Sequence, residues 1–525
     1  MTAASASQSK PPRSVLLLRP DTLGDLVLFS PALHRLREGW TGAQIAVVIR
    51  TPYLELARLL VPDVTWIPTE IDPFAKGPAE VGIQLDQLLD AARKFSPDLI
   101  VAACLRRNWL DTAVAAAVPA ARRVAFGSSE EDPFFGVQVR HRMGAAKEGF
   151  FGETAPAASG EQDWRRNFGL VEYLLGRSVA PVAPSLGIAR DLQDRADAIL
   201  RKLGLEPGKF VACAAAGYAN VRIKTWPAER YAAALDWLRR ERGIRALLIG
   251  QDDERGYLDA LKKSARGAEA EIWTGGAGDL PLQSAILSRS ALYFGNDTGS
   301  MHLAAAVGIP VVAIFGGGTW PRFMPAARRA IALLHPLPCF GCGWDCPFGD
   351  APCVKAVEEE DVLKALSDIL ALDGSAGCEI REAQHLPEPV VAFMGKTAAL
   401  ARQRAKAHLD REHKLEEIAF LAGEKDGEIA ALKAATDEKD AEIEAKDAEI
   451  VSLKRAADEK DAEIAALKKA TDGKDAEIAA LARACEERLQ LIVRLDADLK
   501  RYVQEAGRLQ AEVSKMTIDP PRKLN

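Results

Sequence analysis

Short apolar runs alternate with amphipathic stretches along residues 14–372. The first such runs are Val15–Arg19, Ile45–Ile49 and Asp98–Ala103, and stretches with helical periodicity separate them. A run of four to six apolar residues is typical of a strand that is buried on both faces, and strands that alternate with helices form parallel sheets. The pattern therefore predicts an α/β fold that opens with a βαβ unit.

The same alternation restarts after a proline-rich segment, VAPVAPS, at residues 179–185, with the runs Phe210–Ala214 and Ala246–Gly250. We therefore predict two Rossmann-like domains, an N-terminal domain at residues 14–178 and a C-terminal domain at residues 185–372. Residues 1–13 are polar and are expected to be disordered, and residues 373–404 are expected to form a connector.

The stretch from Ala291 to Thr319 carries the clearest local pattern of the chain. It predicts a strand at Ala291–Phe294, a helix with Asp297 as its N-cap that ends at Gly308, and a second strand at Val311–Phe315. A flexible glycine loop, Gly316–Thr319, follows that strand. A helix N-terminus and a glycine loop at one edge of a parallel sheet favour a ligand that carries phosphate.

The last part of the chain has low complexity and a heptad repeat, and we predict a coiled coil at residues 405–517 and a short tail at 518–525. Isoleucines recur at position a and leucines at position d, which favours a parallel two-stranded arrangement and hence a homo-oligomer. Lysines replace leucine at d in alternate heptads, so moderate stability is expected. A charged single helix or a disordered tail is the alternative.

Composition narrows the class of partner. The 525 residues carry a formal net charge of −6, and 48% of them are hydrophobic, which is enough for a large core. No basic stripe with interleaved aromatic residues is present, which argues against nucleic acid as a partner. The N-terminal sequence has no apolar core of a secretory signal, and no apolar run is long enough to span a membrane, so a cytoplasmic protein is expected.

Four of the eight cysteines, Cys339, Cys342, Cys346 and Cys353, lie within fifteen residues. Four thiolates in one short loop can enclose a tetrahedral Zn²⁺ or an iron ion. Such a site would be structural, because four protein ligands leave no open position for a substrate. The alternative is four free thiols in a reducing compartment.

The run NDTGSMHLAAAVGIPVVAIFG resembles the donor-site signature of glycosyltransferase family nine, the bacterial ADP-heptose:lipopolysaccharide heptosyltransferases. In that family an Asp-Thr-Gly-x-x-His run binds the diphosphate of the nucleotide sugar. The residues that match this run or stand beside it are Asp297, Thr298, Gly299, Ser300 and His302. The glycine-rich loops that contain Gly217, and Gly316 with Thr319, are expected near the donor.

Three further positions follow from the same resemblance. RPDTLGD resembles the family's N-terminal loop, in which the aspartate, here Asp25, is the proposed general base. The alternative for Asp25 is a capping box with Thr22, and both roles can coexist. Lys224, just before Trp226-Pro227, matches the basic residue on the donor phosphates, and Glu254 is a candidate for the nucleoside ribose. Residues Ala214–Ala216 depart from the family pattern, which puts a hydroxyl contact to phosphate in doubt.

The resemblance covers residues 14–372 and implies a GT-B fold, with two Rossmann-like domains and a cleft between them. It implies inverting transfer of heptose from ADP-heptose to a lipopolysaccharide core acceptor, with no cofactor needed for catalysis. Peripheral contact with the inner membrane is a further option. Some members that glycosylate autotransporter proteins carry cysteine-bound iron, so a protein- or other-glycan-directed transferase is one alternative. A coiled-coil scaffold with a degenerate transferase domain is the other.

Overall fold

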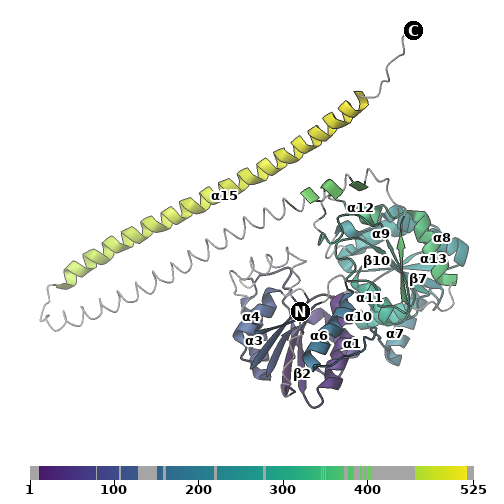
Figure 1. Cartoon of the computed structure of the whole chain (residues 1–525), viewed down its shortest axis with the longest axis horizontal. Coiled ribbons are helices and arrows are strands. Elements are labelled where there is room, and N and C mark those ends of the chain that lie inside the picture. Colours follow the sequence, from purple (N-terminus) through teal and green to yellow (C-terminus); the bar gives the residue numbers. More distant parts are fainter. Residues whose placement is uncertain are drawn as a thin grey trace, which may run out of the picture. The chain divides into compact units, whose positions relative to one another are not determined.

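The computed structural model describes residues 11–77, 80–105, 108–127, 151–157, 161–217, 222–275, 279–344, 346, 348, 350–371, 377–383, 391–392, 395–397, 399–400, 403 and 456–516. It divides into two compact units, Met1–Ala422 and Gly423–Asn525, which are described separately (Figure 1). The described residues contain no helix that is long and apolar enough to cross a membrane.

The first sheet has six parallel strands in the order β3-β2-β1-β4-β5-β6. Its strands are β1 (Ser14–Leu18), β2 (Gln44–Arg50), β3 (Thr65–Thr69), β4 (Leu99–Ala102), β5 (Arg122–Phe126) and β6 (Glu153–Ala155). The helices of this domain are α1 (Leu23–Gly39), α2 (Leu54–Leu60), α3 (Gly82–Phe95), α4 (Trp109–Ala117) and α6 (Asp163–Leu175).

The second sheet has seven parallel strands in the order β13-β12-β11-β10-β7-β8-β9. Its strands are β7 (Phe210–Ala214), β8 (Arg245–Gly250), β9 (Glu271–Thr274), β10 (Leu292–Asn296), β11 (Val311–Phe315), β12 (Arg329–Leu334) and β13 (Gly377–Glu382). Its helices are α7 (Arg190–Lys202), α8 (Ala228–Arg242), α9 (Arg255–Ser264), α10 (Leu280–Ser288), α11 (Gly299–Ala306), α12 (Pro352–Lys355) and α13 (Glu359–Ala371). Figure 1 shows the first sheet in purple and blue and the second in teal and green.

Both sheets are doubly wound, and the predicted α/β fold is confirmed. In each, the strand order reverses beside the first strand, between β1 and β4 and between β7 and β10. The central strands are apolar along their whole length because helices cover both faces of the sheet, as the full burial of Val15–Leu18 and Val311–Phe315 illustrates. In such sheets ligands bind at the carboxyl ends of the strands next to the reversal.

Two expectations about local structure need correction. The N-cap of α11 is Thr298 and not Asp297, because β10 continues through Asn296 and the Asp297 backbone N–H donates to the Ile314 carbonyl at 3.3 Å. Residues 377–382, expected in a connector, form β13 at the edge of the second sheet. Charged residues on this exposed edge, Glu379 and Arg381, concealed the strand in the sequence.

The second unit contains α15 (Ala456–Met516), a helix of 61 residues. Six large apolar side chains of α15 that the structure describes are exposed, among them Ile478 at 65% and Leu481 at 63%. A single chain does not test the predicted coiled coil, and residues 405–455 and 517 of that prediction lie outside the described residues.

Candidate active site

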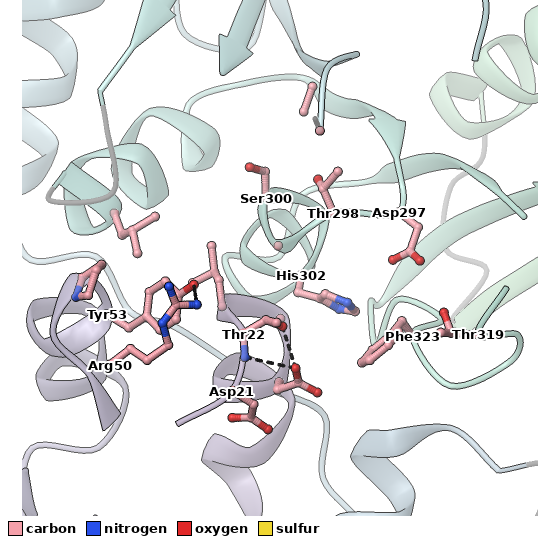
Figure 2. A pocket seen from close by; sticks show the side chains of 18 of the residues that line it. Asp21, Thr22, Arg50, Tyr53, Asp297, Thr298, Ser300, His302, Thr319 and Phe323 are labelled. Atoms are coloured by element: carbon pink, nitrogen blue, oxygen red, sulfur yellow. Dashed lines mark hydrogen bonds between the residues drawn. The ribbon is translucent and has the colours of Figure 1, made fainter. Parts of the chain in front are cut away.

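A cavity of about 500 Å³ opens between the carboxyl ends of the two sheets. Loops that follow β1, β2, β7, β8 and β10 supply most of its wall, as the reversal of strand order in each sheet predicts. Figure 2 shows Asp21 and Thr22 of the first domain opposite Thr298, Ser300 and His302 of the second. The predicted site residues that line the cavity are Asp25, Gly217, Lys224, Glu254, Asp297, Thr298, Gly299, Ser300, His302 and Thr319.

Asp25 lies in the first turn of α1 and closes the turn that follows β1. Its Oδ2 accepts hydrogen bonds from the Thr22 backbone N–H at 3.2 Å and the Thr22 hydroxyl at 2.5 Å. These bonds are half of a capping box, which holds the carboxylate in one position at the cavity wall. The capping role is therefore present, and it is compatible with a catalytic role because the carboxylate also faces the cavity.

Arg19 and Asp21 form a buried ion pair behind this turn. Arg19 Nη2 is 2.9 Å from Asp21 Oδ2, and the same guanidinium donates to the carbonyls of Asp25 at 3.0 Å and Ala103 at 2.6 Å. Burial raises the pKa of the Asp21 carboxyl, and Arg19 opposes that rise. Arg19 therefore ties the Asp25 backbone to the end of β4. Our sequence analysis missed this pair, although a charged residue directly after an apolar strand is a detectable signal.

Two helix N-termini, those of α1 and α11, meet at the contact between the domains. A Cβ atom on Gly24 would lie 2.8 Å from His302 Cδ2, and a Cβ atom on Gly299 would lie 2.7 Å from Leu23 Cδ2. Each helix therefore contributes one glycine that admits one side chain of the other. This reciprocal packing brings Asp25 and the first turn of α11 to the same cavity.

The charged groups on the second domain are placed for an anion. The N-terminus of α11, where the helix dipole is positive, lines the cavity through Thr298, Gly299 and Ser300. Burial raises the pKa of the Asp297 carboxyl and lowers that of the His302 imidazole to about 3, so this histidine is neutral. Lys224 acts on both groups: it lowers the pKa of Asp297 and lowers that of His302 further.

The loops around this anion site are fixed by Asn296, which lies fully buried at the end of β10. Its Oδ1 accepts from the Tyr231 hydroxyl at 2.8 Å and from the Trp226 backbone N–H at 3.2 Å. Its Nδ2 donates to the carbonyls of Ala215 and Ala216 at 2.8 and 3.2 Å. One side chain thus connects β10, the loop after β7 and the start of α8.

Glu254 is buried, with 5% of its surface exposed, and supports the loop after β7. Its Oε1 accepts from the Gly217 N–H at 2.8 Å, and its Oε2 accepts from the Gln251 N–H at 3.0 Å. Gly217 has φ +134°, which favours glycine, and its Cα packs towards the Thr298 methyl group. Glu254 is therefore not a solvated loop carboxylate, although a position in a loop directly after a strand would also be typical of one.

Further charged residues in the cavity wall were missed by the sequence analysis. Arg322, after β11, makes a bidentate ion pair with Asp163 of α6, with Nη2 to Oδ2 at 2.6 Å, and so joins the two domains. Arg50, at the end of β2, contacts Asp72 at 2.7 Å and the Tyr53 hydroxyl at 3.3 Å. The carboxylate partners, Asp163 and Asp72, are distant in the chain from Arg322 and Arg50, so no local pattern pairs them.

The glycine loop after β11 is covered. A Cβ atom on Gly317 would lie 2.1 Å from Phe340 Cδ1, and one on Gly316 would lie 2.7 Å from Trp344 Cη2. Gly316 therefore lies beneath Trp344 and, unlike Thr319, does not line the cavity. The loop that covers it is the one that carries the cysteines.

No disulfide joins the four clustered cysteines in the part of the chain that the structure describes, and Cys339 and Cys353 are buried while Cys342 and Cys346 are half-buried. Burial raises the pKa of Cys353 to about 11, and its sulfur accepts from the Gly317 N–H at 3.4 Å. Among the residues that the structure describes, no three or more histidine, cysteine, aspartate or glutamate side chains are grouped so that they could hold a metal ion. The described geometry therefore gives the predicted structural zinc or iron no support.

Comparison with known proteins agrees with this site. Residues 148–343 match the model of glycosyltransferase family 9 (heptosyltransferase). This segment is therefore similar to glycosyltransferase family 9. The matched segment contains the predicted donor-side residues from Gly217 to Thr319 and two of the four clustered cysteines, Cys339 and Cys342.

Individual relatives extend the likeness to both domains of the family 9 fold. The crystal structure of the glycosyl transferase family 9 protein from Veillonella parvula superimposes with a TM-score of 0.56 at 20% identity, covering 68% of this chain and 97% of that one. Escherichia coli ADP-heptose LPS heptosyltransferase II gives a TM-score of 0.51 at 16% identity, covering 68% and 98%. At these identities the likeness shows the fold, which is that of GT-B heptosyltransferase structures.

A curated relative is similar over a shorter length. Lipopolysaccharide heptosyltransferase 3 from Escherichia coli K12 is 32% identical over 99 residues, which is 18% of this chain. The chain spans 27% of the length of that relative. Asp25 lies outside the segment that the family 9 model matches, so its assignment depends on the geometry of the cavity.

Proposed function

We propose that the protein is an inverting glycosyltransferase that transfers heptose from ADP-heptose to a lipopolysaccharide core acceptor. The observation that carries the proposal is the shared cavity, in which Asp25 of the first domain faces Lys224 and the α11 N-terminus of the second. A base on one domain and an anion site on the other are what transfer between a bound acceptor and a bound nucleotide sugar requires.

In the proposed reaction Asp25 accepts the proton of an acceptor hydroxyl while that oxygen attacks the anomeric carbon of the donor. The bond between the anomeric carbon and the phosphate oxygen breaks, and the nucleoside diphosphate leaves with the bonding electron pair. Lys224 and the N–H groups of Gly299 and Ser300 stabilise the charge that develops on the diphosphate. The step balances without a redox cofactor, and no metal is assigned to it.

The electrostatics of the cavity wall favour Lys224 for this role. The arginines of the wall, Arg19, Arg50 and Arg322, each make an ion pair with a carboxylate. Among the described lining residues, Lys224 is the cation that makes no ion pair with a carboxylate within 4.0 Å. Its charge is therefore the one that a diphosphate can neutralise most directly.

Thermal denaturation in the presence of ADP, UDP, GDP or CMP tests the donor. A ligand that binds the native state raises the melting temperature by mass action, so selective stabilisation by ADP supports the proposal. Stabilisation by UDP or GDP would still support a glycosyltransferase, but one whose donor carries that nucleotide instead of ADP. No stabilisation by any nucleotide would contradict the proposal and favour the alternative of a scaffold with a degenerate domain.

We also propose that α15 and the heptads before it assemble two chains through a parallel coiled coil. Three of the exposed apolar side chains of α15, Leu467, Ile478 and Leu481, fall at position a or d of the heptad, which supports burial against a second copy. A cytoplasmic location, with contact to the inner membrane where the acceptor would lie, stays a prediction of the resemblance. The alternative of a metal-bearing, protein- or other-glycan-directed transferase has no specific observation in its favour.

A further inference from the structure

Trp344 has a backbone conformation that large side chains rarely adopt. Its φ is +71°, in the left-handed region that favours glycine, and Gly341 and Gly343 before it also have positive φ values. A bulky residue in this region is strained, and such strain is characteristic of functional sites. The side chain reaches the cavity that holds the candidate active site and forms part of its wall.

The glycine loop after β11 supports the indole from below. A Cβ atom on Gly318 would lie 2.3 Å from Trp344 Cδ2, and one on Gly316 would lie 2.7 Å from Cη2, so the ring lies directly on the glycine backbone. The Gly341 N–H donates to the Gly317 carbonyl at 2.7 Å, and the Gly343 N–H donates to the Gly318 carbonyl at 2.9 Å. The cysteine-bearing loop therefore holds the indole in a fixed place.

The position of Trp344 in the cavity indicates what it contacts. Glu254, the candidate for the ribose, follows β8, and the loop beneath Trp344 follows β11. Strands β7 and β10 lie between, so the two ends of the site are about 14 Å apart at the usual strand spacing. The α11 N-terminus follows β10, between these two ends. A nucleotide sugar with its diphosphate at α11 and its nucleoside towards β8 would direct its sugar towards Trp344.

We propose that the indole face of Trp344 is the platform on which the sugar of the donor rests. The inference depends on the proposed function and names a sugar-binding residue of that site. An aromatic face carries partial negative charge and attracts the polarised C–H bonds of a pyranose ring, as it attracts the positive edge of another aromatic ring. Phe323 and Thr319 line the same end of the cavity and complete an apolar wall with one hydroxyl. The Phe323 ring also contacts His302, at 6.3 Å between centroids.

Titration calorimetry of the full chain with ADP and with ADP-heptose tests the platform. Trp344→Leu removes the aromatic face, so it is expected to weaken binding of ADP-heptose about tenfold and to leave binding of ADP within about twofold. Trp344→Phe keeps an aromatic face and is expected to retain most of the affinity for ADP-heptose. Trp237→Leu is the matched control, because Trp237 lies on α8 outside the cavity.

Each outcome decides one point. If Trp344→Leu weakens both ligands equally, or neither, the platform is wrong. If the leucine variant does not fold, the phenylalanine variant decides: equal losses for both ligands would overturn the inference. If the wild type binds neither ADP nor ADP-heptose, the proposed function is wrong, and the platform, which depends on it, is wrong as well. If the wild type binds ADP and ADP-heptose with equal affinity, only the platform is wrong.

Discussion

Gly24 and His302 lie against each other at the contact between the two domains, where a Cβ atom on Gly24 would be 2.8 Å from His302 Cδ2. The two residues are far apart in the sequence, and each belongs to one of the two motifs that resemble family nine. The glycine therefore has a packing function that is independent of any contact with the acceptor. It permits the α1 N-terminus, with Asp25, to approach the donor-side helix.

Gly24→Ala is expected to displace the buried His302 ring and to lower the free energy of unfolding by about 1–3 kcal/mol, as overpacked substitutions commonly do. Chemical denaturation measures the loss. Gly169→Ala is the matched control, because Gly169 lies inside α6 and an added Cβ atom there meets nothing within 4 Å. An alanine at that helix position is expected to be neutral or stabilising. Equal stability of the Gly24 variant and the wild type would contradict the packing role.

Asp25→Asn separates the proposed base from the capping residue. The asparagine oxygen can still accept the hydrogen bonds of Thr22, so the melting temperature is expected to change little. Removal of the base is expected to lower kcat about 10²–10⁴-fold, while the affinity for ADP stays the same. Steady-state kinetics and calorimetry on one preparation measure both quantities. Wild-type activity in the asparagine variant would exclude Asp25 as the base and leave only its cap.

The fold could be predicted from the sequence because parallel strands buried on both faces are continuous apolar runs. Val311–Phe315 was expected as a strand and is β11 within the same bounds. The sequence could also predict that the donor-side residues lie close together. Gly217, Glu254 and Asp297 each follow a strand, and the carboxyl ends of these strands share one edge of the sheet. Each of these signals is local in the sequence, and the doubly wound topology brings the residues that carry them close together in space.

What could not be predicted depends on contacts between distant segments. Asp163 and Arg322 are 159 positions apart, and nothing in either local sequence pairs them. The conformation of Trp344 is likewise set by the packing of one loop on another, since tryptophan has no preference for positive φ. The edge strand β13 was missed because half of its residues are charged, as solvent-facing edges commonly are.

The buried His302 predicts how stability depends on pH. Its pKa is lowered by burial to about 3, against 6.5 in the unfolded chain, so the unfolded state binds the extra proton between these values. Stability from this residue is therefore complete above pH 6.5 and is lost as the pH falls towards 3. His302→Asn removes the titration. Between pH 7 and 4.5 the wild type is expected to lose about 2–3 kcal/mol more than the variant, as measured by denaturant unfolding.

The predicted coiled coil depends on the a and d positions of α15, which would form the seam between two chains. In the predicted heptad register, Ile478 occupies position a and Leu481 occupies position d, and both are exposed in the single chain. The double substitution Ile478→Asp and Leu481→Asp places two charges in the centre of a coiled-coil seam. It is therefore expected to convert the assembled full-length chain to smaller species, because unpaired charges are costly to bury. Sedimentation velocity measures the change.

Two controls make that result specific to a parallel seam. Arg483→Asp changes position f, outside the seam, and is expected to leave the assembly intact. Cys485 occupies position a, so in a parallel in-register pair the two Cys485 thiols face each other. Mild oxidation is then expected to cross-link two wild-type chains but not two Cys485→Ser chains. A monomeric wild type would contradict the coiled coil, and an assembled wild type without the cross-link would indicate a different register or an antiparallel pair, since only the parallel in-register arrangement brings equivalent a positions together.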